Sequence, residues 1–170
     1  MSDVKEARAT TREPIEKNSL AGTVVDIGDL ASLAGCHLGT SSWHVITQDQ
    51  VDRFAEATGD RQWIHVDRQR AMTGPFEGTI AHGYLTLSLG PALLDEVIDV
   101  VGATRIINYG LNKVRFPAPV MTGSRVRLGA GLREVDEVPG GLQAAFELTF
   151  ATEGREKPAC YAEALFRYYR

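Results

Sequence analysis

The stretch IAHGYLTLSLGPALLDEVI, residues 80–98, decides how this chain can fold. Apolar residues recur around the whole circumference that a helix of this length would have, from Ile80 through Leu89 to Ile98. A helix without a polar face is a buried one, so the stretch predicts a long central helix covered on all sides. Pro91 lies inside it and removes one backbone hydrogen bond, which predicts a kink near residues 87–91.

After this stretch the apolar period changes from helical to alternating. Two segments, 125–135 and 142–153, place every second apolar side chain on one face: Val126, Leu128, Ala130, Leu132, Leu142, Ala144, Phe146, Leu148 and Phe150. Pro139-Gly140-Gly141 between them predicts a hairpin. Residues 104–116 and 159–169 predict two further strands, and residues 41–47 a fifth. One buried helix with a run of antiparallel strands predicts an α+β fold in which a sheet wraps around the helix.

The N-terminal part has a different character. Its first 20 or so residues are polar, lack periodicity and contain Pro14, so residues 1–28 are expected to form a flexible extension before a single domain, residues 29–170. These first residues have no apolar core of a signal peptide, and nowhere does the sequence reach the roughly 20 apolar residues of a membrane helix. We therefore expect a soluble, cytoplasmic protein that does not bind membranes.

Charge and cysteine content narrow the function classes. The formal net charge of −4 argues against nucleic acid as a partner, because phosphate binding needs a basic field. Cys36 and Cys160 are far apart and have no neighbouring ligand pattern, so we expect neither a disulfide framework nor a metal site. The absence of Gly-rich nucleotide loops, a GxSxG motif and an HExxH motif removes the commonest dinucleotide, phosphoryl-transfer, serine hydrolase and zinc protease chemistries.

The motif GDRQWIHVD, residues 59–67, connects two predicted helices. The first helix is expected to start after Thr47 and stop at Gly59, and the second to start after Asp67. On an ideal helix Asp60 and His65 would lie roughly 140° apart, so they can converge only if the motif is a loop. A carboxylate and an imidazole are sufficient for acid–base chemistry near neutral pH. The motif alone therefore makes Asp60 and His65 candidates for an acid–base pair, and a purely structural role for them stays open at this point.

Gly83 supplies a second half of the predicted site. It stands at the start of the central helix, where the first backbone N–H groups have no partner within the helix. Such a donor can stabilise an oxyanion, and a glycine lets a ligand carbonyl approach the backbone closely. The preceding His82 is expected to fix the entry to the helix.

Taken together, ATGDRQWIHVDRQRA (57–71) followed by GTIAHGYL (78–85) resembles the signature of the MaoC-like (R)-specific enoyl-CoA hydratases, which have the hot-dog fold. The family pattern is Gly-Asp-x-Asn-Pro-(Ile/Leu)-His followed by a His-Gly helix start. Gln62 and Trp63 replace its Asn-Pro. This departure, with NYGLNKVRFPAPV (108–120), is similar to the nodulation protein N-like branch.

The resemblance implies a function. It implies (R)-specific hydration of trans-2-enoyl-CoA, or the reverse dehydration, as part of fatty acid metabolism, without a cofactor. Asp60 and His65 would be the acid–base pair and the Gly83 N–H the oxyanion donor. A family serine that supports the pair is matched by Pro91, with Ser88 the nearby hydroxyl.

The same resemblance implies a homodimer that covers a free sheet edge. Trp63, Phe76 and Tyr84 would line an acyl tunnel, and Lys113 and Arg115 would meet the phosphates of coenzyme A. Two alternatives stay open at this point. One is a hot-dog thioesterase, and the other is a dimer that binds acyl thioesters without turnover.

Overall fold

The computed structural model describes residues 22–170. Residues 1–21, most of the predicted extension, lie outside the described residues. In chain order the elements are β1 (Thr23–Asp26), a 3-10 helix η1 (Leu30–Leu33), β2 (His37–Thr40), β3 (His44–Val45), α1 (Gln48–Thr58), α2 (Trp63–Val66), α3 (Arg68–Met72), α4 (Gly83–Ser88), α5 (Gly90–Asp95), β4 (Ile98–Val101), β5 (Arg105–Arg115), β6 (Arg125–Val138), β7 (Gly141–Thr152) and β8 (Cys160–Tyr169).

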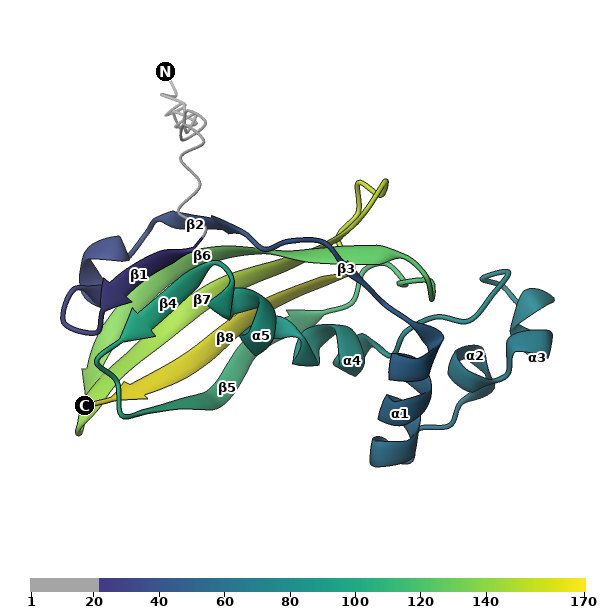
Figure 1. Cartoon of the computed structure of the whole chain (residues 1–170), viewed down its shortest axis with the longest axis horizontal. Coiled ribbons are helices and arrows are strands. Elements are labelled where there is room, and N and C mark those ends of the chain that lie inside the picture. Colours follow the sequence, from purple (N-terminus) through teal and green to yellow (C-terminus); the bar gives the residue numbers. More distant parts are fainter. Residues whose placement is uncertain (1–21) are drawn as a thin grey trace, which may run out of the picture.

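The main sheet confirms the predicted antiparallel run. Its order is β2-β6-β7-β8-β5, with β3 also paired to β6, and all its pairs are antiparallel. Val138 pairs with Gly141, so Pro139 and Gly140 form the hairpin turn predicted between β6 and β7. The sheet curves around α4 and α5, which lie against its inner face (Figure 1). The architecture is the α+β hot-dog fold.

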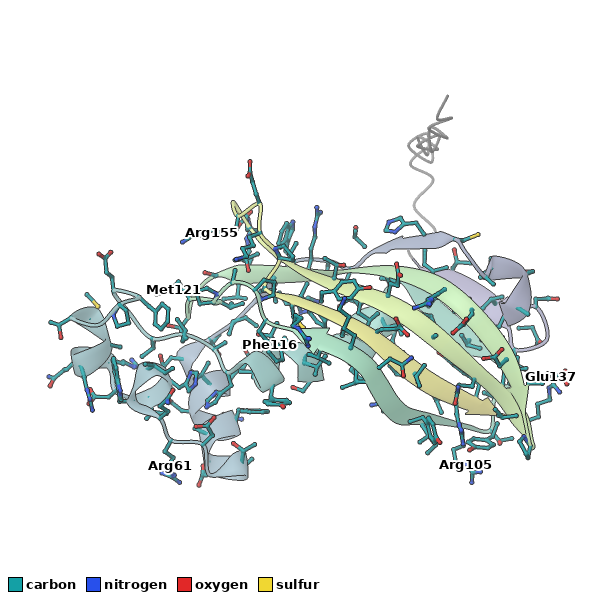
Figure 2. The ribbon with its side chains drawn as sticks, turned by 180° about the vertical axis from the view of Figure 1, so that it is seen from behind. Arg61, Arg105, Phe116, Met121, Glu137 and Arg155 are labelled. Carbon is teal, nitrogen blue, oxygen red and sulfur yellow. The ribbon has the colours of Figure 1, made fainter. Side chains whose placement is uncertain are left out.

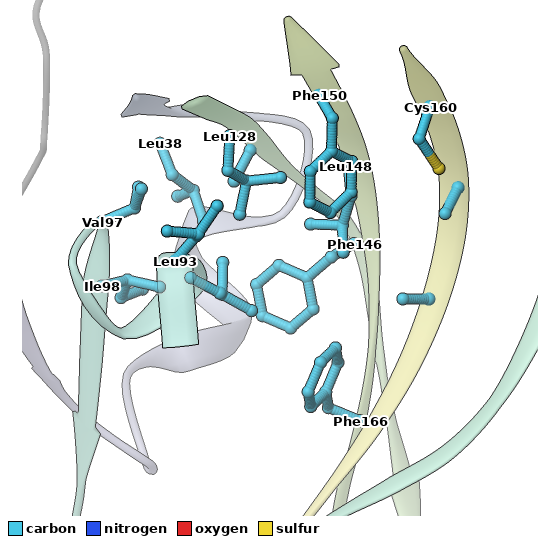
Figure 3. Packing of buried hydrophobic residues seen from close by; sticks show 14 of the residues in the cluster. Leu38, Leu93, Val97, Ile98, Leu128, Phe146, Leu148, Phe150, Cys160 and Phe166 are labelled. Atoms are coloured by element: carbon cyan, nitrogen blue, oxygen red, sulfur yellow. The ribbon is translucent and has the colours of Figure 1, made fainter. Parts of the chain in front are cut away.

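The core lies between α5 and the inner face of the sheet. Every second side chain of β6 and β7 is buried there, as the alternation predicts: Val126, Leu128, Ala130, Leu132, Leu142, Ala144, Phe146, Leu148 and Phe150. Leu93 of α5 points toward these rows (Figure 3). The rings of Phe146 and Phe166 meet edge to face, with centroids 5.5 Å apart. These apolar contacts hold α5 in a fixed place relative to the sheet.

The predicted kink near residues 87–91 is confirmed by a break in the helix there, but the prediction of one buried helix over residues 80–98 is wrong in three respects. The segment forms two short helices, α4 and α5, because Pro91 cannot continue the hydrogen bonding of the first and takes an early position of the second instead. The end of the segment, from Ile98, is strand β4. Burial is also incomplete, since Tyr84 is 71% exposed. The helical segment therefore presents one apolar patch to the outside.

The N-terminal boundary and the first strands also need correction. Residues 23–26, placed in the extension by their position, form β1 and pair in parallel with β4. The β-branched run of Thr23, Val24 and Val25 favours this strand, but its partner lies more than 70 residues away in sequence. The strand predicted over residues 41–47 is only the two-residue β3, and β2 was not predicted. Both short strands exist because β6 supplies the hydrogen bonds.

Helix α1 has the two ends that the sequence predicts. The Thr47 hydroxyl accepts a hydrogen bond from the Gln50 N–H, and the Gln50 side chain caps Thr47 in return. Gly59 ends the helix with a φ of 77°, a left-handed conformation that favours glycine. Helices α1, α2 and α3 project together beyond one end of the sheet (Figures 1 and 2). No helix within residues 22–170 has the length and apolar character needed to span a membrane.

Candidate active site

Asp60 and His65 lie close together where α1 gives way to α2. Gly59 turns the chain, Asp60 to Gln62 are not helical, and α2 then places His65 on a single helical turn. The predicted loop therefore contains a short helix, but Asp60 precedes it, and this lets the two side chains converge. A carboxylate oxygen of Asp60 and ring nitrogens of His65 and His82 lie within 4.8 Å of one another. The acid–base pair that the sequence predicts is thus brought together, with Asp60 exposed and His65 buried.

The ring of His65 is held in one tautomer. Its Nδ1 lies 2.7 Å from the main-chain oxygen of Ile80, and because a carbonyl oxygen can only accept, Nδ1 carries the proton. The lone pair is then on Nε2. Burial lowers the pKa of His65 below its ordinary 6.5, and nearby His82 lowers it further, while the Ile80 hydrogen bond and the Asp60 charge act in the opposite direction. The neutral ring, with a free Nε2, is the favoured form.

The backbone of His65 is braced from α1. The side-chain amide of Gln48 donates to the main-chain oxygen of His65 at 2.7 Å. The amide oxygen of Gln48 accepts from the hydroxyl of Thr79, which also contacts the hydroxyl of Thr122 at 2.8 Å. The Ile80 N–H donates to the Ile64 carbonyl. We call helices α1, α2 and α3 the helical arm. These bonds join the helical arm to the segment leading into α4, so His65 keeps a fixed position relative to Gly83.

Gly83 is the first residue of α4, as predicted, and it borders a cavity. Among the hydrogen bonds of residues 22–170 there is none from its backbone N–H. A side-chain carbon at this position would lie 2.9 Å from Cγ of Phe116, so only glycine fits. The cavity has a volume of about 270 Å³ and is lined by His65, Phe76, Ile80, Ala81, Gly83, Thr86, Phe116, Pro117, Ala118, Pro119, Val120 and Ala159. It therefore combines the imidazole and the unpaired backbone donor in one mainly apolar space.

His82 stacks on His65 and raises the question of a metal ion. Within the described part of the chain, the only cluster with the composition of a metal site is Asp60, His65 and His82. The two rings lie with centroids 3.8 Å apart and planes inclined by 25°. An ion bound at the usual 2.0–2.1 Å to one ring, in the plane of that ring, would lie far out of the plane of the other. The arrangement favours proton transfer over metal binding.

The three side chains predicted to line the acyl tunnel have different surroundings. Phe76 lines the cavity beside His65. Trp63 does not; its ring lies against the backbone of Gly74, and the guanidinium of Arg70 lies 4.4 Å from the ring centre. Tyr84 is exposed, and its ring packs against Phe116 in a T-shaped arrangement with centroids 5.8 Å apart. Trp63 therefore packs against α3 and against the residues that follow this helix.

Lys113 and Arg115 lie on β5, outside the lining of the cavity. The ammonium of Lys113 lies 5.8 Å from the centre of the Tyr161 ring. Arg115 donates to its neighbouring main-chain oxygen on Val114, and its side chain is exposed. Arg115 immediately precedes Phe116, which covers Gly83. Contact of either side chain with coenzyme A phosphates stays a prediction.

Pro91 and Ser88 belong to a different space. Both line a second cavity of about 300 Å³, between the two helices and strands β5, β7 and β8, and neither borders the cavity that contains His65. The Ser88 hydroxyl donates to the Leu85 carbonyl at 2.7 Å. Neither residue therefore supports the acid–base pair directly.

The sequence did not predict the contacts that two residues, Phe116 and His82, make near the predicted acid–base pair. Phe116 was passed over, although it covers Gly83 and lines the cavity. The sequence around it, RFPAPV, reads as the end of a strand and carries no catalytic motif. His82 was expected only to fix the helix entry, and its stacking on His65 joins residues 17 positions apart. The His-Gly pair at the helix start was the one signal that could have suggested it.

Several known proteins are similar to this chain in sequence or in fold. Residues 29–141 match the family model described as MaoC like domain. The chain is 52% identical over 147 residues to 3-hydroxyacyl-thioester dehydratase Z of Mycobacterium tuberculosis. The matched region covers 86% of this chain and 97% of that protein. It is 42% identical over 141 residues to nodulation protein N of Rhizobium leguminosarum bv. viciae. This match covers 81% of this chain and 88% of that protein.

A solved structure has the same fold. The (R)-hydratase from A. caviae involved in PHA biosynthesis superposes with a TM-score of 0.65 at 24% identity, covering 78% of this chain and 96% of that one. Fold and relatives together define a hydro-lyase built on the hot-dog fold. The chain belongs to the MaoC-like dehydratase family, and its relatives include the nodulation protein N branch.

Proposed function

We propose that this protein catalyses the reversible, (R)-specific addition of water to a trans-2-enoyl-CoA, giving a (3R)-3-hydroxyacyl-CoA. The observation that carries the proposal is that one cavity is lined by both His65, whose Nε2 is free, and Gly83, whose N–H is unpaired, with Asp60 beside His65. The 52% identical relative named as a 3-hydroxyacyl-thioester dehydratase supports the same substrate class.

The residues fit each step of this reaction. Water loses a proton to the Asp60–His65 pair as its oxygen bonds to the β-carbon, and the electrons of the double bond move toward the thioester oxygen. The Gly83 N–H stabilises the negative charge on that oxygen. A proton from the pair then bonds to the α-carbon, so the pair ends in its starting state. We assign the base to His65, because its Nδ1 is committed to Ile80 and its Nε2 is not.

A single assay tests this activity. Purified protein is incubated with crotonyl-CoA and with longer trans-2-enoyl-CoAs, while loss of the enoyl absorbance and release of free thiol are followed together. We expect loss of the enoyl absorbance without thiol release, and a (3R) product on chiral analysis. Thiol release would instead identify a thioesterase. Binding of the substrate with neither change would identify an acyl-thioester-binding protein and contradict the proposal.

We also propose that the protein is a homodimer joined through β5. Within residues 22–170 this strand pairs only with β8, and it exposes the apolar side chains of Ile106, Ile107, Tyr109 and Leu111. A long apolar edge strand invites pairing with another chain. A second copy is the occupant favoured here, because pairing with an identical strand satisfies the free backbone groups of both copies.

The dimer is tested by sedimentation. Wild-type protein at micromolar concentration is expected to sediment as a dimer, and Ile107→Lys is expected to shift it toward monomer by placing a charge in the contact. Val24→Lys is the control, since Val24 is an apolar residue on a different sheet and is more exposed than Ile107, at 62% against 41%. A monomeric wild type, or an unchanged mass for Ile107→Lys, would contradict the proposed contact.

The cytoplasm is the compartment that we propose. Cys36 and Cys160 are both free, and Cys36 is exposed to solvent. An exposed unpaired thiol is typical of a reducing compartment.

A further inference from the structure

His82 is enclosed between two other rings at the start of α4. Only 3% of its surface is exposed. Its ring stacks on His65 of α2, and it also meets the ring of Phe54 of α1 at a centroid distance of 5.0 Å and an angle of 49°. The ring is therefore held by two elements that belong to the helical arm, while its own backbone caps α4. It joins the two halves of the site.

A hydrogen bond fixes which nitrogen of His82 carries the proton. Nε2 lies 2.9 Å from the main-chain oxygen of Asp60, which can only accept, so Nε2 is the donor. Nδ1 is buried and has no partner among the described residues. Nε2 is therefore the atom through which the His82 ring holds the backbone of Asp60.

Asp60 has weak restraints apart from this bond. Its own N–H lies 3.4 Å from the Thr58 hydroxyl, and its carboxylate lies 3.5 Å from the Gln62 N–H, both at or near the limit for a hydrogen bond. The bond from His82 is shorter than either, and its donor comes from a buried ring. The backbone position of Asp60 therefore depends mainly on His82.

We infer that His82 is a positioning residue, which holds the Asp60 backbone and the His65 ring in one arrangement next to the Gly83 N–H. It acts through those groups, because it does not line the cavity where His65 and Gly83 meet. The inference rests on the proposed function for its kinetic readout. Its geometric part, the placement of Asp60 beside His65, can be measured without any substrate.

Two substitutions separate the hydrogen bond of His82 from its stacking. In His82→Gln the amide nitrogen can reach the place of Nε2 and keep the bond to Asp60. In His82→Phe the ring and its stacking remain, but the donor is lost. We expect His82→Phe to lower kcat about 10- to 100-fold with little change in KM, because a small misplacement of a catalytic group has an effect of this size. His82→Gln is expected to retain kcat within about fivefold.

A titration measures the placement directly. The charged or titratable groups that act on His65 are Asp60 and His82, so the change in the His65 titration caused by Asp60→Asn, followed by NMR, reports how near Asp60 lies. Removing the Asp60 charge is expected to lower the pKa of His65 in the wild-type background and in His82→Gln. In His82→Phe the same substitution is expected to have a much smaller effect.

The possible outcomes are distinct. Equal kcat losses in His82→Gln and His82→Phe, or an Asp60 effect on the titration that survives in His82→Phe, would overturn the positioning role. A wild type that hydrates no enoyl-CoA would contradict the proposed function, while the titration would still decide the role of His82. Thermal unfolding of both variants shows that each is folded, so that loss of structure is not mistaken for loss of positioning.

Discussion

Replacing Asp60 by Asn, or His65 by Gln, is expected to lower kcat for hydration of crotonyl-CoA by about 10²- to 10⁴-fold, the usual contribution of a positioned acid or base. Asn has nearly the size of Asp but cannot carry the charge or take a proton. Gln in place of His65 has no lone pair of comparable basicity to offer the attacking water. Because the two groups act on one water and one substrate, the double variant is expected to lose little more than either single variant.

Matched controls distinguish chemistry from a general effect of charge. Asp49→Asn removes an exposed carboxylate from the neighbouring helix, and His37→Gln removes an exposed imidazole from β2. Both are expected to keep kcat near that of the wild type. Near-normal rates in Asp60→Asn and His65→Gln would refute the assignment of the site. Thermal unfolding of all four variants is measured alongside, since His65 is buried and its replacement also affects packing.

The pH dependence of the wild type is a further readout of His65. A base must be unprotonated to accept a proton from water, and burial lowers the pKa of His65 below 6.5. The neutral ring therefore persists to more acidic pH than an exposed histidine would allow. We expect the acid limb of kcat/KM to have its midpoint below pH 6.5, and a midpoint above this value would contradict His65 as the base.

Removing the Gly83 N–H is expected to lower kcat by about 10²- to 10³-fold, the usual effect of losing one oxyanion donor. Gly83→Pro removes this N–H with little disturbance of the helix. Gly83 is the first residue of α4, where proline is well accepted, and His82 already has the extended conformation (φ −61°, ψ 138°) that a following proline requires. The effect is expected in kcat more than in KM, because the negative charge develops only as water adds.

The neighbouring Phe116 determines the control for this experiment. Any side chain at position 83 meets the Phe116 ring, so Gly83→Pro and Gly83→Ala are both made in a Phe116→Ala background. The alanine variant adds a side-chain carbon and keeps the N–H, and the proline variant adds a ring and loses it. The ratio of their kcat values isolates the donor. Equal values would show that the Gly83 N–H does not stabilise the transition state.

The residues of the proposed site were largely foreseeable, but their arrangement was not. Asp60, His65 and Gly83 stand in short motifs whose residue types indicate the chemistry. The structure places Asp60 beside His65, and His65 at the same cavity as Gly83. The cavity wall opposite them comes from residues 116–120, which join two strands far along the chain. No local pattern marks such a wall, because its residues are selected by shape and by contact with Gly83.

The sequence by itself determined those features that depend on neighbours along the chain. Thr47 and Gly59 set the ends of α1 through hydrogen bonds and a backbone conformation within the helix itself. The alternation in β6 and β7 decided which face is buried, since successive side chains of a strand point to opposite sides. These features follow from local geometry, so no knowledge of the remaining fold was needed.

Only the tertiary structure decided the features that depend on distant partners. Strand β1 exists because β4 lies beside it, and β2 and β3 exist because β6 supplies their hydrogen bonds. The stacking of His82 on His65, and its bond to Asp60, require the helical arm to fold back onto the start of α4. The free energy of such contacts depends on packing between segments, and packing is fixed only when the whole chain is folded.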